Sequence, residues 1–237
     1  MQIAIISDVH ANLEALQTVF EYTRQHDIET VFCLGDSVGY GPNPNECVTL
    51  IKEHCTHVIM GNHDYAAVGL ANTEFFNINA KSAIAWTRNQ LTTENTNFLK
   101  KLPFTTVYEH LLLTHASPKS PSSWEYVLTH QAALKQFKVF KQNICFIGHS
   151  HVPIIYTPSA YFTDKKIILE RGESYIVNVG SVGQPRDGDP RTCFVLLDTE
   201  TNSLEYIRLK YDTRKTSEKI KNAGLPSYLA DRILYGQ

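Results

Sequence analysis

Two histidines separated by one residue, His149 and His151, follow a short apolar run and a glycine. The run, Ile144 to Ile147, is typical of a buried strand, and Gly148 lets the backbone turn without the steric penalty of a Cβ atom. We therefore expect the end of this strand to present both imidazoles to one point in space. Imidazole is the commonest metal-ligating side chain and a frequent acid–base catalyst, so the pair is a candidate for metal binding.

Four further apolar runs end in the same kind of side chain. In an open α/β sheet, ligands bind outside the carboxyl ends of the strands, so all five ends could converge on one site. None of these ends carries cysteine, and the donors are carboxylate, amide and imidazole, which indicates a metal centre of more than one ion. The residues concerned are Asp8 and His10 after Ile3 to Ile6, Asp36 after Val31 to Leu34, Asn62, His63 and Asp64 after Val58 to Met60, and His115 after Leu111 to Leu113.

The elements that carry these ends alternate between strand and helix in the first part of the chain. Apolar residues at helical spacing predict a helix over 13–25, with Asn12 available as its N-cap, and a second helix opens at Pro42 to Pro44. This alternation favours a parallel half-sheet covered by helices. Residues 65–102 interrupt it with two predicted helices, 80–90 and 93–102, joined to the strand by a polar loop that holds Phe75 and Phe76.

The second half of the chain is predicted to be mainly β. A two-residue connection, Glu109 and His110, joins two hairpin-like strands, and one helix over 130–138 precedes the histidine-bearing strand. The tail, 213–237, has two short helical patterns broken near Gly224. The predicted strands are 105–108, 111–114, 144–147, 154–157, 166–169, 175–178, 193–198 and 204–209.

Composition limits the classes of function. The 237 residues are 43% hydrophobic and 19% charged, with a net charge of −2, so the chain lacks the excess positive charge expected of a dedicated nucleic-acid binder. Five cysteines without a CxxC pair argue against a disulfide framework and a structural zinc site. A strand beginning within two residues of Met1 and the lack of a membrane-length apolar run lead us to expect a cytoplasmic protein without a membrane partner.

In order and spacing, the strand ends resemble the five-motif signature of the calcineurin-like metallophosphoesterases. The resemblance spans residues 1 to about 200 and uses every motif, and two further stretches, 39–42 and 180–186, are similar to its small bacterial and archaeal branch of YfcE-type phosphodiesterases. It implies one domain over 1–237 with an α/β, four-layer αββα sandwich of two mixed sheets, in which 65–102 is a helical insertion and 213–237 a helical tail. The motifs are Asp8-Val9-His10, Gly35-Asp36, Gly61-Asn62-His63-Asp64, His115 and Gly148-His149-Ser150-His151.

The resemblance also implies roles for these residues. Two divalent ions, with manganese expected first and iron, zinc, nickel or cobalt as alternatives, would clamp a phosphate and deliver hydroxide in line. His63 is not a ligand and would act as general acid for the leaving oxygen or as a donor to the phosphate, with Asp64 the nearest candidate to orient it. The implied ligand set is Asp36 as the bridge, Asp8, His10 and His151 at the first ion, and Asn62, His115 and His149 at the second.

The substrate side of the site is less defined by the sequence. Protein phosphatases of this superfamily carry an Asp and an Arg shortly after Gly-Asp, whereas this chain has Ser37-Val38-Gly39-Tyr40. Tyr40, the loop with Phe75 and Phe76, and Arg186 or Arg191 are candidates to line a narrowed mouth. Two alternatives stay open: Phe75, Phe76 and Trp86 could pack helices on the sheet, and both arginines could pair with Asp187 and Asp189.

These observations predict a dinuclear metal-dependent phosphoesterase that hydrolyses small phosphate esters, most readily diesters. The alternatives are a non-catalytic metal-binding scaffold for protein partners and a nuclease on the same centre, which the absence of excess positive charge disfavours. A homodimer is one open oligomeric state. The histidines outside the motifs are expected to be bystanders, namely His26, His54, His57, His110 and His130.

Overall fold

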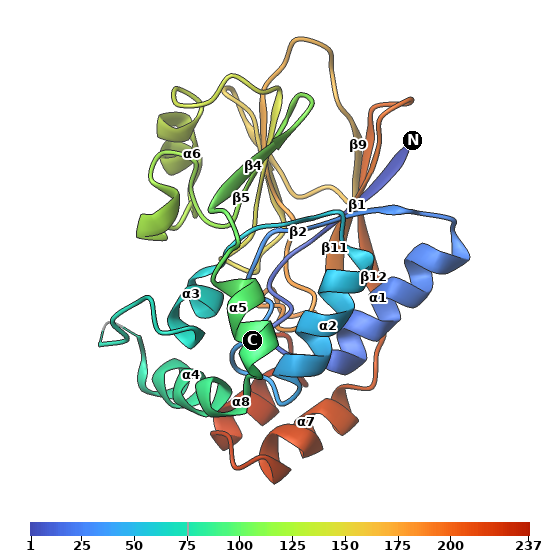
Figure 1. Ribbon diagram of the computed structural model, residues 1–237. Helices are drawn as coiled ribbons and strands as arrows, with labels where there is room; N and C mark the ends of the chain where they lie inside the picture. The colour runs from blue at the N-terminus through green and yellow to red at the C-terminus, as the bar shows by residue number, and fades with distance from the viewer. Residues whose placement is uncertain (75) are drawn as a thin grey trace.

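The computed structural model describes residues 1–74 and 76–237 and contains two mixed sheets of six strands each (Figure 1). The predicted four-layer architecture is confirmed. In spatial order the first sheet consists of β3 (His57–Val58), β2 (Thr30–Cys33), β1 (Gln2–Ile6), β11 (Thr192–Asp198), β12 (Ser203–Leu209) and β9 (Lys166–Ile168). The second consists of β4 (Thr105–Tyr108), β5 (Leu111–Thr114), β6 (Ile144–Ile147), β10 (Tyr175–Asn178), β7 (Ile154–Tyr156) and β8 (Tyr161–Phe162).

Helices cover the outer faces of both sheets. α1 (Leu13–Gln25) and α2 (Pro44–His54) pack on the first sheet, and α6 (His130–Gln136) packs on the second. Figure 1 shows α6 on one side of the strands and α1 and α2 on the other. The core between the sheets is made of buried apolar side chains from both, including Ile5, Phe32, Phe146 and Val177. Burial of such side chains is the main favourable contribution to folding.

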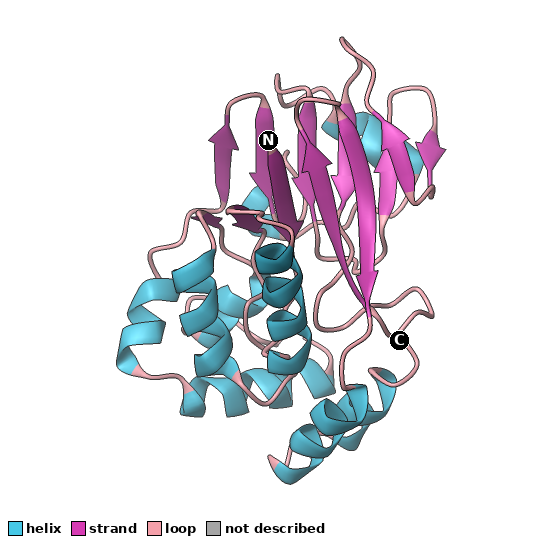
Figure 2. Cartoon of the chain, turned by 90° about the vertical axis from the view of Figure 1, so that its right-hand side faces the viewer, coloured by secondary structure: helices cyan, strands magenta, loops and turns pink. Residues whose placement is uncertain are grey.

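Parallel pairing brings the carboxyl ends of the relevant strands to one edge. β1 pairs in parallel with β2, and β2 with β3, while β6 pairs in parallel with both β5 and β10. Within each sheet, the strands that precede the predicted ligands therefore all point in one direction. In Figure 2 the strands meet the helical part of the molecule at this end.

The helical insertion contains one element that the sequence did not indicate. β3 ends at Val58, and a short helix, α3 (Asn62–Ala67), begins directly at the motif residue Asn62. Two predicted helices follow as α4 (Ile78–Gln90) and α5 (Thr93–Leu99). The side chains of Asn77 and Thr92 cap them, accepting hydrogen bonds from the main-chain N–H groups of Ala80 and Asn95.

The C-terminal helices pack against the insertion rather than extending into solvent. α7 (Thr213–Asn222) and α8 (Ser227–Arg232) share an apolar cluster with α4 and with Tyr40. Trp86 and Phe76 border this cluster, which supports the packing interpretation for Trp86. Phe75 lies outside the described residues. A single 3₁₀ turn (Pro121–Ser123) completes the described helical elements.

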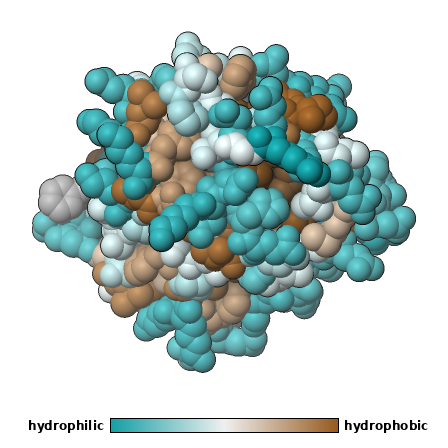
Figure 3. All heavy atoms as spheres, turned by 90° about the horizontal axis from the view of Figure 1, so that it is seen from above, coloured by the Kyte–Doolittle hydropathy of each residue, from teal (hydrophilic) through white to brown (hydrophobic). Residues whose placement is uncertain are grey.

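The opposite end of the molecule, where β1 begins, shows hydrophilic side chains with hydrophobic ones among them (Figure 3). Val107 and Ile168 are two exposed hydrophobic residues of the strands, at 52% and 62%. Single exposed apolar side chains are common on proteins and indicate no function by themselves. Among the described residues, no helix is both long enough and apolar enough to cross a bilayer.

Candidate metal centre

The predicted ligands lie on loops that are joined to one another by main-chain hydrogen bonds. The N–H group of Asp8 donates to Gly35 O over 3.0 Å, and that of His10 donates to Asp36 O over 2.9 Å. Across the two sheets, the N–H group of His149 donates to Asp8 Oδ2 over 3.0 Å. The strand ends thus form one rigid cradle, and the structure brings all seven predicted ligands into it.

Most of these ligands have an unusual backbone conformation. A positive φ is uncommon for residues other than glycine and costs of order 1–3 kcal/mol when the surroundings enforce it. Such strain clusters at functional sites, where it fixes the direction of a side chain. The strained ligands are Asp8 (φ 55°), His10 (49°), Asp36 (52°), His149 (67°) and His151 (61°).

The first group of ligands consists of Asp8, His10 and His151. The Nδ1 atoms of His10 and His151 face the carbonyl oxygens of Val38 and Gln184, at 3.2 and 2.5 Å, which assigns the ring proton to Nδ1. The two Nε2 atoms then face each other as lone pairs only 3.1 Å apart. Asp8 Oδ1, which lies 3.1 Å from His151 Nε2, is buried without a hydrogen-bond partner among the described residues. Three electron-rich atoms around one point fit a cation.

The second group consists of Asp36, Asn62, His115 and His149. The Nδ1 atom of His115 faces Leu34 O at 2.8 Å, and its Nε2 atom lies 3.1 Å from Asn62 Oδ1. Nδ1 carries a proton, and a metal ion bound at Nε2 would displace the second proton of this ring and face two acceptors. The Nε2 atom of His149 is buried and has no hydrogen-bond partner in the described part of the chain. These orphaned acceptors fit a second cation.

Asp36 lies between the two groups. Its Oδ2 atom is 3.7 Å from His10 Nε2 and 3.3 Å from His115 Nε2. Its Oδ1 atom accepts the N–H group of His63 over 2.8 Å, which fixes the orientation of the carboxylate. This position is the one that a bridging ligand requires.

The pKa values of the residues in this cradle reflect how close together the residues lie. Burial by itself would raise the pKa of Asp8 and of Asp36, but the neighbouring histidines outweigh it and hold both pKa values below the ordinary range. Burial would lower the pKa of His115, but the charge of Asp36 outweighs it and raises this pKa to about 9. For His149, burial dominates and lowers the pKa to about 3. The carboxylates are therefore ionised and ready to accept positive charge.

This donor set fits divalent metal ions. The predicted ligand atoms are oxygen and imidazole nitrogen. In three of the four histidines, the other ring nitrogen donates a hydrogen bond to a main-chain carbonyl oxygen. Such outer contacts typically set the ring orientation in metal sites. Without a thiolate the set suits manganese, iron, cobalt, nickel or zinc and does not select one of them.

His63 lies beside the ligands. Its ring centre is 4.8 Å from that of His10 and 4.4 Å from that of Tyr40, and its Nδ1 atom is buried without a hydrogen-bond partner among the described residues. Burial lowers its pKa to about 4. Gly39 makes room for the ring, since a Cβ atom there would lie 2.5 Å from Nδ1.

The suggestion that Asp64 orients His63 is corrected by the structure. The two carboxylate oxygens of Asp64 accept the main-chain N–H groups of Val38 and Gly61, each over 3.1 Å. Burial, followed by the charge of Asp36, raises its pKa to about 7. Asp64 therefore ties two ligand loops together and forms no hydrogen bond to the imidazole among the described residues.

The two candidate arginines have different surroundings. Arg186 lies at the site, with Cζ 5.9 Å from the centre of the Tyr40 ring and Nη2 donating to Gln184 Oε1 over 3.0 Å. Arg191 is paired with Asp189 through its Nε and Nη2 atoms. It also lines a separate cavity of about 350 Å³, which favours the pairing alternative over the predicted role in substrate binding.

Two aromatic residues that the sequence analysis did not single out belong to the site. The Tyr126 ring stacks on that of His149, with centres 4.0 Å apart and planes 22° apart, and Tyr126 remains 51% exposed. Trp124 lies edge-on to His115 at 5.9 Å. Both come shortly after His115 in the chain, and this closeness in the sequence was the feature that could have indicated their place at the site. Phe76 approaches His63 edge-on at 5.4 Å, as expected of a residue at the mouth.

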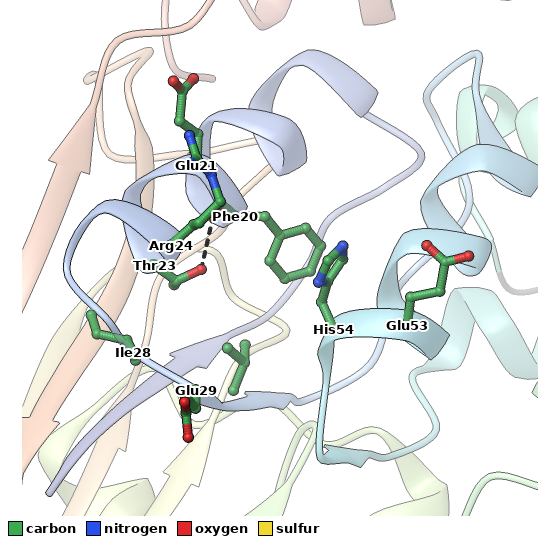
Figure 4. Close-up of a pocket in the computed structure, with 9 residues that line it drawn as sticks. Phe20, Glu21, Thr23, Arg24, Ile28, Glu29, Glu53 and His54 are labelled. Atoms are coloured by element: carbon green, nitrogen blue, oxygen red, sulfur yellow. Dashed lines mark hydrogen bonds between the residues drawn. The ribbon is translucent and has the colours of Figure 1, made fainter.

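A larger groove of about 500 Å³ lies away from this centre, between α1 and the end of α2 (Figure 4). Phe20, Arg24, Glu53 and His54 are among its lining residues. This groove contains none of the predicted ligands, so the volume of a pocket does not indicate where the candidate metal centre lies.

Comparison with known proteins identifies the class. Residues 1–202 match the family described as the calcineurin-like phosphoesterase superfamily domain, and the chain belongs to that superfamily. It is thus a hydrolase that acts on phosphate esters, in a family that uses divalent metals.

Individual relatives agree with this class. Over 243 residues the chain is 38% identical to the uncharacterized protein MJ0912 of Methanocaldococcus jannaschii, covering 99% of this chain and 98% of that one. It is 25% identical over 207 residues to the phosphodiesterase YfcE of Escherichia coli, covering 86% and 91%, which confirms the resemblance to that branch. A metallophosphoesterase structure from Sphaerobacter thermophilus superposes with a TM-score of 0.90 at 36% identity, covering 100% and 99% of the two chains.

Proposed function

We propose that this protein is a dinuclear metal-dependent phosphodiesterase of small phosphate esters. The observation that carries the proposal is the cluster of buried acceptors around Asp36. The Nε2 atoms of His10 and His151 face each other without a proton between them, and Asp8 Oδ1 and His149 Nε2 have no hydrogen-bond partner among the described residues. Two divalent ions held there would stabilise the charge of a phosphate and acidify a water molecule.

The residues at the site would have separate roles in metal binding and in proton transfer. Asp8, His10 and His151 would hold one ion, Asn62, His115 and His149 would hold the other, and Asp36 would contribute to both. His63 donates a proton to the leaving oxygen. Its pKa of about 4 belongs to the metal-free site, and in the loaded site the metal ions would lower this pKa while the negative charge of a bound phosphate would raise it.

The preference for small diesters rests on the walls of the site. Tyr40 and Phe76 border His63, and Tyr126 covers His149, so aromatic side chains surround the ligands on two sides. Arg186 supplies a guanidinium for non-bridging phosphate oxygens. A phosphoprotein or a long duplex needs a more open groove, and the net charge of −2 gives no attraction for nucleic acid.

The test compares three substrates at one fixed free metal concentration. We expect hydrolysis of bis-p-nitrophenyl phosphate after loading with Mn²⁺, loss of activity with a chelator, and little action on a phosphoprotein or on duplex DNA. A clear preference in kcat/KM for either macromolecule would contradict the proposed substrate class. Failure of every metal listed above to bind or to restore activity would contradict the metal centre itself.

A matched pair of variants distinguishes loss of the metal site from a general effect on folding. Asp36→Asn should remove both ions and abolish turnover. Asp27→Asn is the control, because Asp27 has the same left-handed backbone (φ 54°) but is exposed and far from the ligands in the structure. The control should keep its metal content and activity.

We also propose that the protein works in a reducing compartment, the cytoplasm. All five cysteines are free thiols rather than disulfides. Burial raises the pKa of Cys33 to about 12, which is typical of an unreactive thiol in a protein core. The oligomeric state follows from none of these observations and can be measured by light scattering.

A further inference from the structure

One aromatic side chain at the candidate metal centre lies against a predicted ligand and is nevertheless exposed. The Tyr126 ring stacks on that of His149, with centres 4.0 Å apart and planes 22° apart, and Tyr126 is 51% exposed. The ligand atoms of His149, Asp36 and His115 lie within 4.8 Å of one another, so Tyr126 borders the second group of ligands directly. A molecule bound at these ligands would therefore lie within reach of the exposed part of the ring.

The other aromatic residues in contact with the predicted ligands have less free surface. Tyr40, which contacts His10, is 6% exposed and belongs to the apolar cluster that α4, α7 and α8 form. Trp124, which contacts His115, is half-buried among other aromatic rings. Among the described tyrosine, tryptophan and phenylalanine residues that contact a predicted ligand, Tyr126 alone is exposed.

The neighbours of Tyr126 in the chain hold it in this position. The ring of Trp124 lies 5.9 Å from that of Tyr65 and 5.6 Å from that of Phe104, centre to centre. Val127 is 3% exposed and belongs to a core cluster with residues of the second sheet. Because the chain is anchored on both sides of Tyr126, the ring is in place before a substrate binds, and a contact with it costs little ordering.

The position of Tyr126 distinguishes the two ester groups of a phosphodiester. His63, the proposed acid for the leaving oxygen, contacts His10 of the first group of ligands, with ring centres 4.8 Å apart. Tyr126 contacts His149 of the second group. The departing group would thus lie on the side of His63, and the group that stays on the phosphate would lie on the side of Tyr126.

We propose that Tyr126 is the stacking surface for an aromatic group in the retained ester, so that aryl and nucleoside diesters are preferred over alkyl diesters. The inference rests on the proposed function and narrows its substrate class. An exposed aromatic ring favours contact with a second ring over contact with a small alkyl group. In the reaction, water adds its oxygen to phosphorus, the bond to the departing ester oxygen breaks and that oxygen takes up a proton. The products are an alcohol and a monoester that keeps the stacked group.

The test uses two diesters with one leaving group, phenyl p-nitrophenyl phosphate and methyl p-nitrophenyl phosphate. Both release p-nitrophenolate, so they differ only in the retained group. The measured quantity is the ratio of their kcat/KM values, phenyl over methyl, at one fixed free Mn²⁺ concentration; comparing this ratio between variants cancels the intrinsic reactivity of each ester. Tyr126→Leu should lower the ratio about five- to tenfold, mainly through a higher KM for the phenyl ester. Tyr126→Phe keeps the ring and should retain most of the ratio.

The matched control is Tyr161→Leu, because Tyr161 is a tyrosine of similar exposure, 59%, on the edge strand β8. It should leave the ratio unchanged. An unchanged ratio in Tyr126→Leu with normal metal content, or equal losses in Tyr126→Leu and Tyr126→Phe, would overturn the proposal. If Tyr126→Leu fails to bind metal, Tyr126→Trp decides, because a larger ring should raise the ratio and an unchanged or lower ratio would contradict stacking.

A binding experiment separates this inference from the proposed function. If the unaltered protein hydrolyses no diester, the proposed function is wrong. Titration calorimetry of the Mn²⁺-loaded protein with phenylphosphonate and methylphosphonate then still tests the stacking surface. The phenyl compound should bind about fivefold more tightly than the methyl compound, and Tyr126→Leu should remove this difference. Equal affinities in the unaltered protein, or a difference that persists in Tyr126→Leu, would overturn the role of Tyr126.

Discussion

The attachment of the C-terminal helices depends on a buried carboxylate, Glu14, at the start of α1. Its Oε1 atom lies 2.6 Å from Lys219 Nζ and 3.3 Å from Lys215 Nζ, and its Oε2 atom accepts the hydroxyl of Thr216 over 3.2 Å. Glu14 is thus the point where the segment after the first ligand loop holds α7. We expect Glu14→Gln to weaken this contact while preserving its size and shape.

The magnitude follows from the exposure of each partner. A buried hydrogen bond to a charged group contributes about 1.5–3 kcal/mol, and an exposed ion pair about 0.2–1 kcal/mol. The Glu14 side chain is 5% exposed, Lys219 is 32% exposed and Lys215 is 58% exposed. Because glutamine still accepts a hydrogen bond, the free energy of unfolding should fall by about 1–2 kcal/mol, which corresponds to a Tm lower by about 2–8 °C for a chain of this length.

The pH dependence gives a sharper check. Burial would raise the pKa of Glu14, but the hydrogen bond and charge of Lys219 outweigh it, so the pKa lies below its ordinary value of 4.5. The stability from ionised Glu14 is therefore fully present above pH 4.5 and is lost as the pH falls through the lower pKa of the folded state. The difference between the original protein and Glu14→Gln should be constant near pH 7 and shrink toward pH 4.

Urea denaturation at fixed metal concentration measures this difference, with Glu218→Gln as the control on an exposed carboxylate of α7. In a double-mutant cycle, Glu14→Gln and Lys219→Met should show a coupling energy of about 1 kcal/mol. Equal unfolding free energies for Glu14→Gln and the unaltered protein at pH 7, or a difference that persists unchanged at pH 4, would refute this account of the attachment.

Three further outcomes follow from the site. His63→Ala should keep its metal content, measured by elemental analysis, and lose about 10²–10⁴-fold in rate on a diester with an alkoxide leaving group. The loss should be smaller with a nitrophenolate leaving group, which needs no proton. Loss of metal would show instead that His63 is a ligand. Gly61→Ala places a Cβ atom 2.1 Å from Asp36 Oδ1 and should lower both metal content and stability, whereas normal metal content would contradict the tight packing of these loops. Arg186→Gln should raise KM for bis-p-nitrophenyl phosphate while Arg191→Gln leaves it unchanged, and equal effects would contradict the assignment of Arg191 to its pair with Asp189.

Much of the fold was predictable because burial leaves a direct mark on the sequence. β1, β5 and β6 are short apolar runs, and the structure buries them with little deviation from the predicted bounds. β8 was missed because it is a two-residue edge strand whose side chains, Tyr161 and Phe162, are exposed. α3 was missed because its first residues, the predicted ligand Asn62 and its polar neighbours, show no apolar stripe, and Asp64 fixes the start of the helix by accepting main-chain N–H groups.

The substrate side was predictable only in part, for a physical reason. The predicted ligands follow their strands directly, so their positions are set by local sequence and by sheet pairing. The surroundings of Arg186 and Tyr126 depend instead on contacts between segments far apart in the chain, such as Arg186 with Tyr40 and Tyr126 with His149. No local periodicity reports such contacts, and the alternatives for Arg186 and Arg191 could be separated only when their partners were known.

The same distinction explains how this fold can keep its chemistry while its specificity changes. The ligand cradle is held by main-chain hydrogen bonds and strained backbone, which most substitutions elsewhere in the chain leave intact. The C-terminal helices are held beside this cradle by other contacts, since Glu14 binds Lys219 of α7 and Gly236 packs against the loop of Arg186. A change in the C-terminal helices would therefore alter the packing around Tyr40 while leaving intact the contacts that hold the predicted metal ligands, since the two are built by separate sets of contacts.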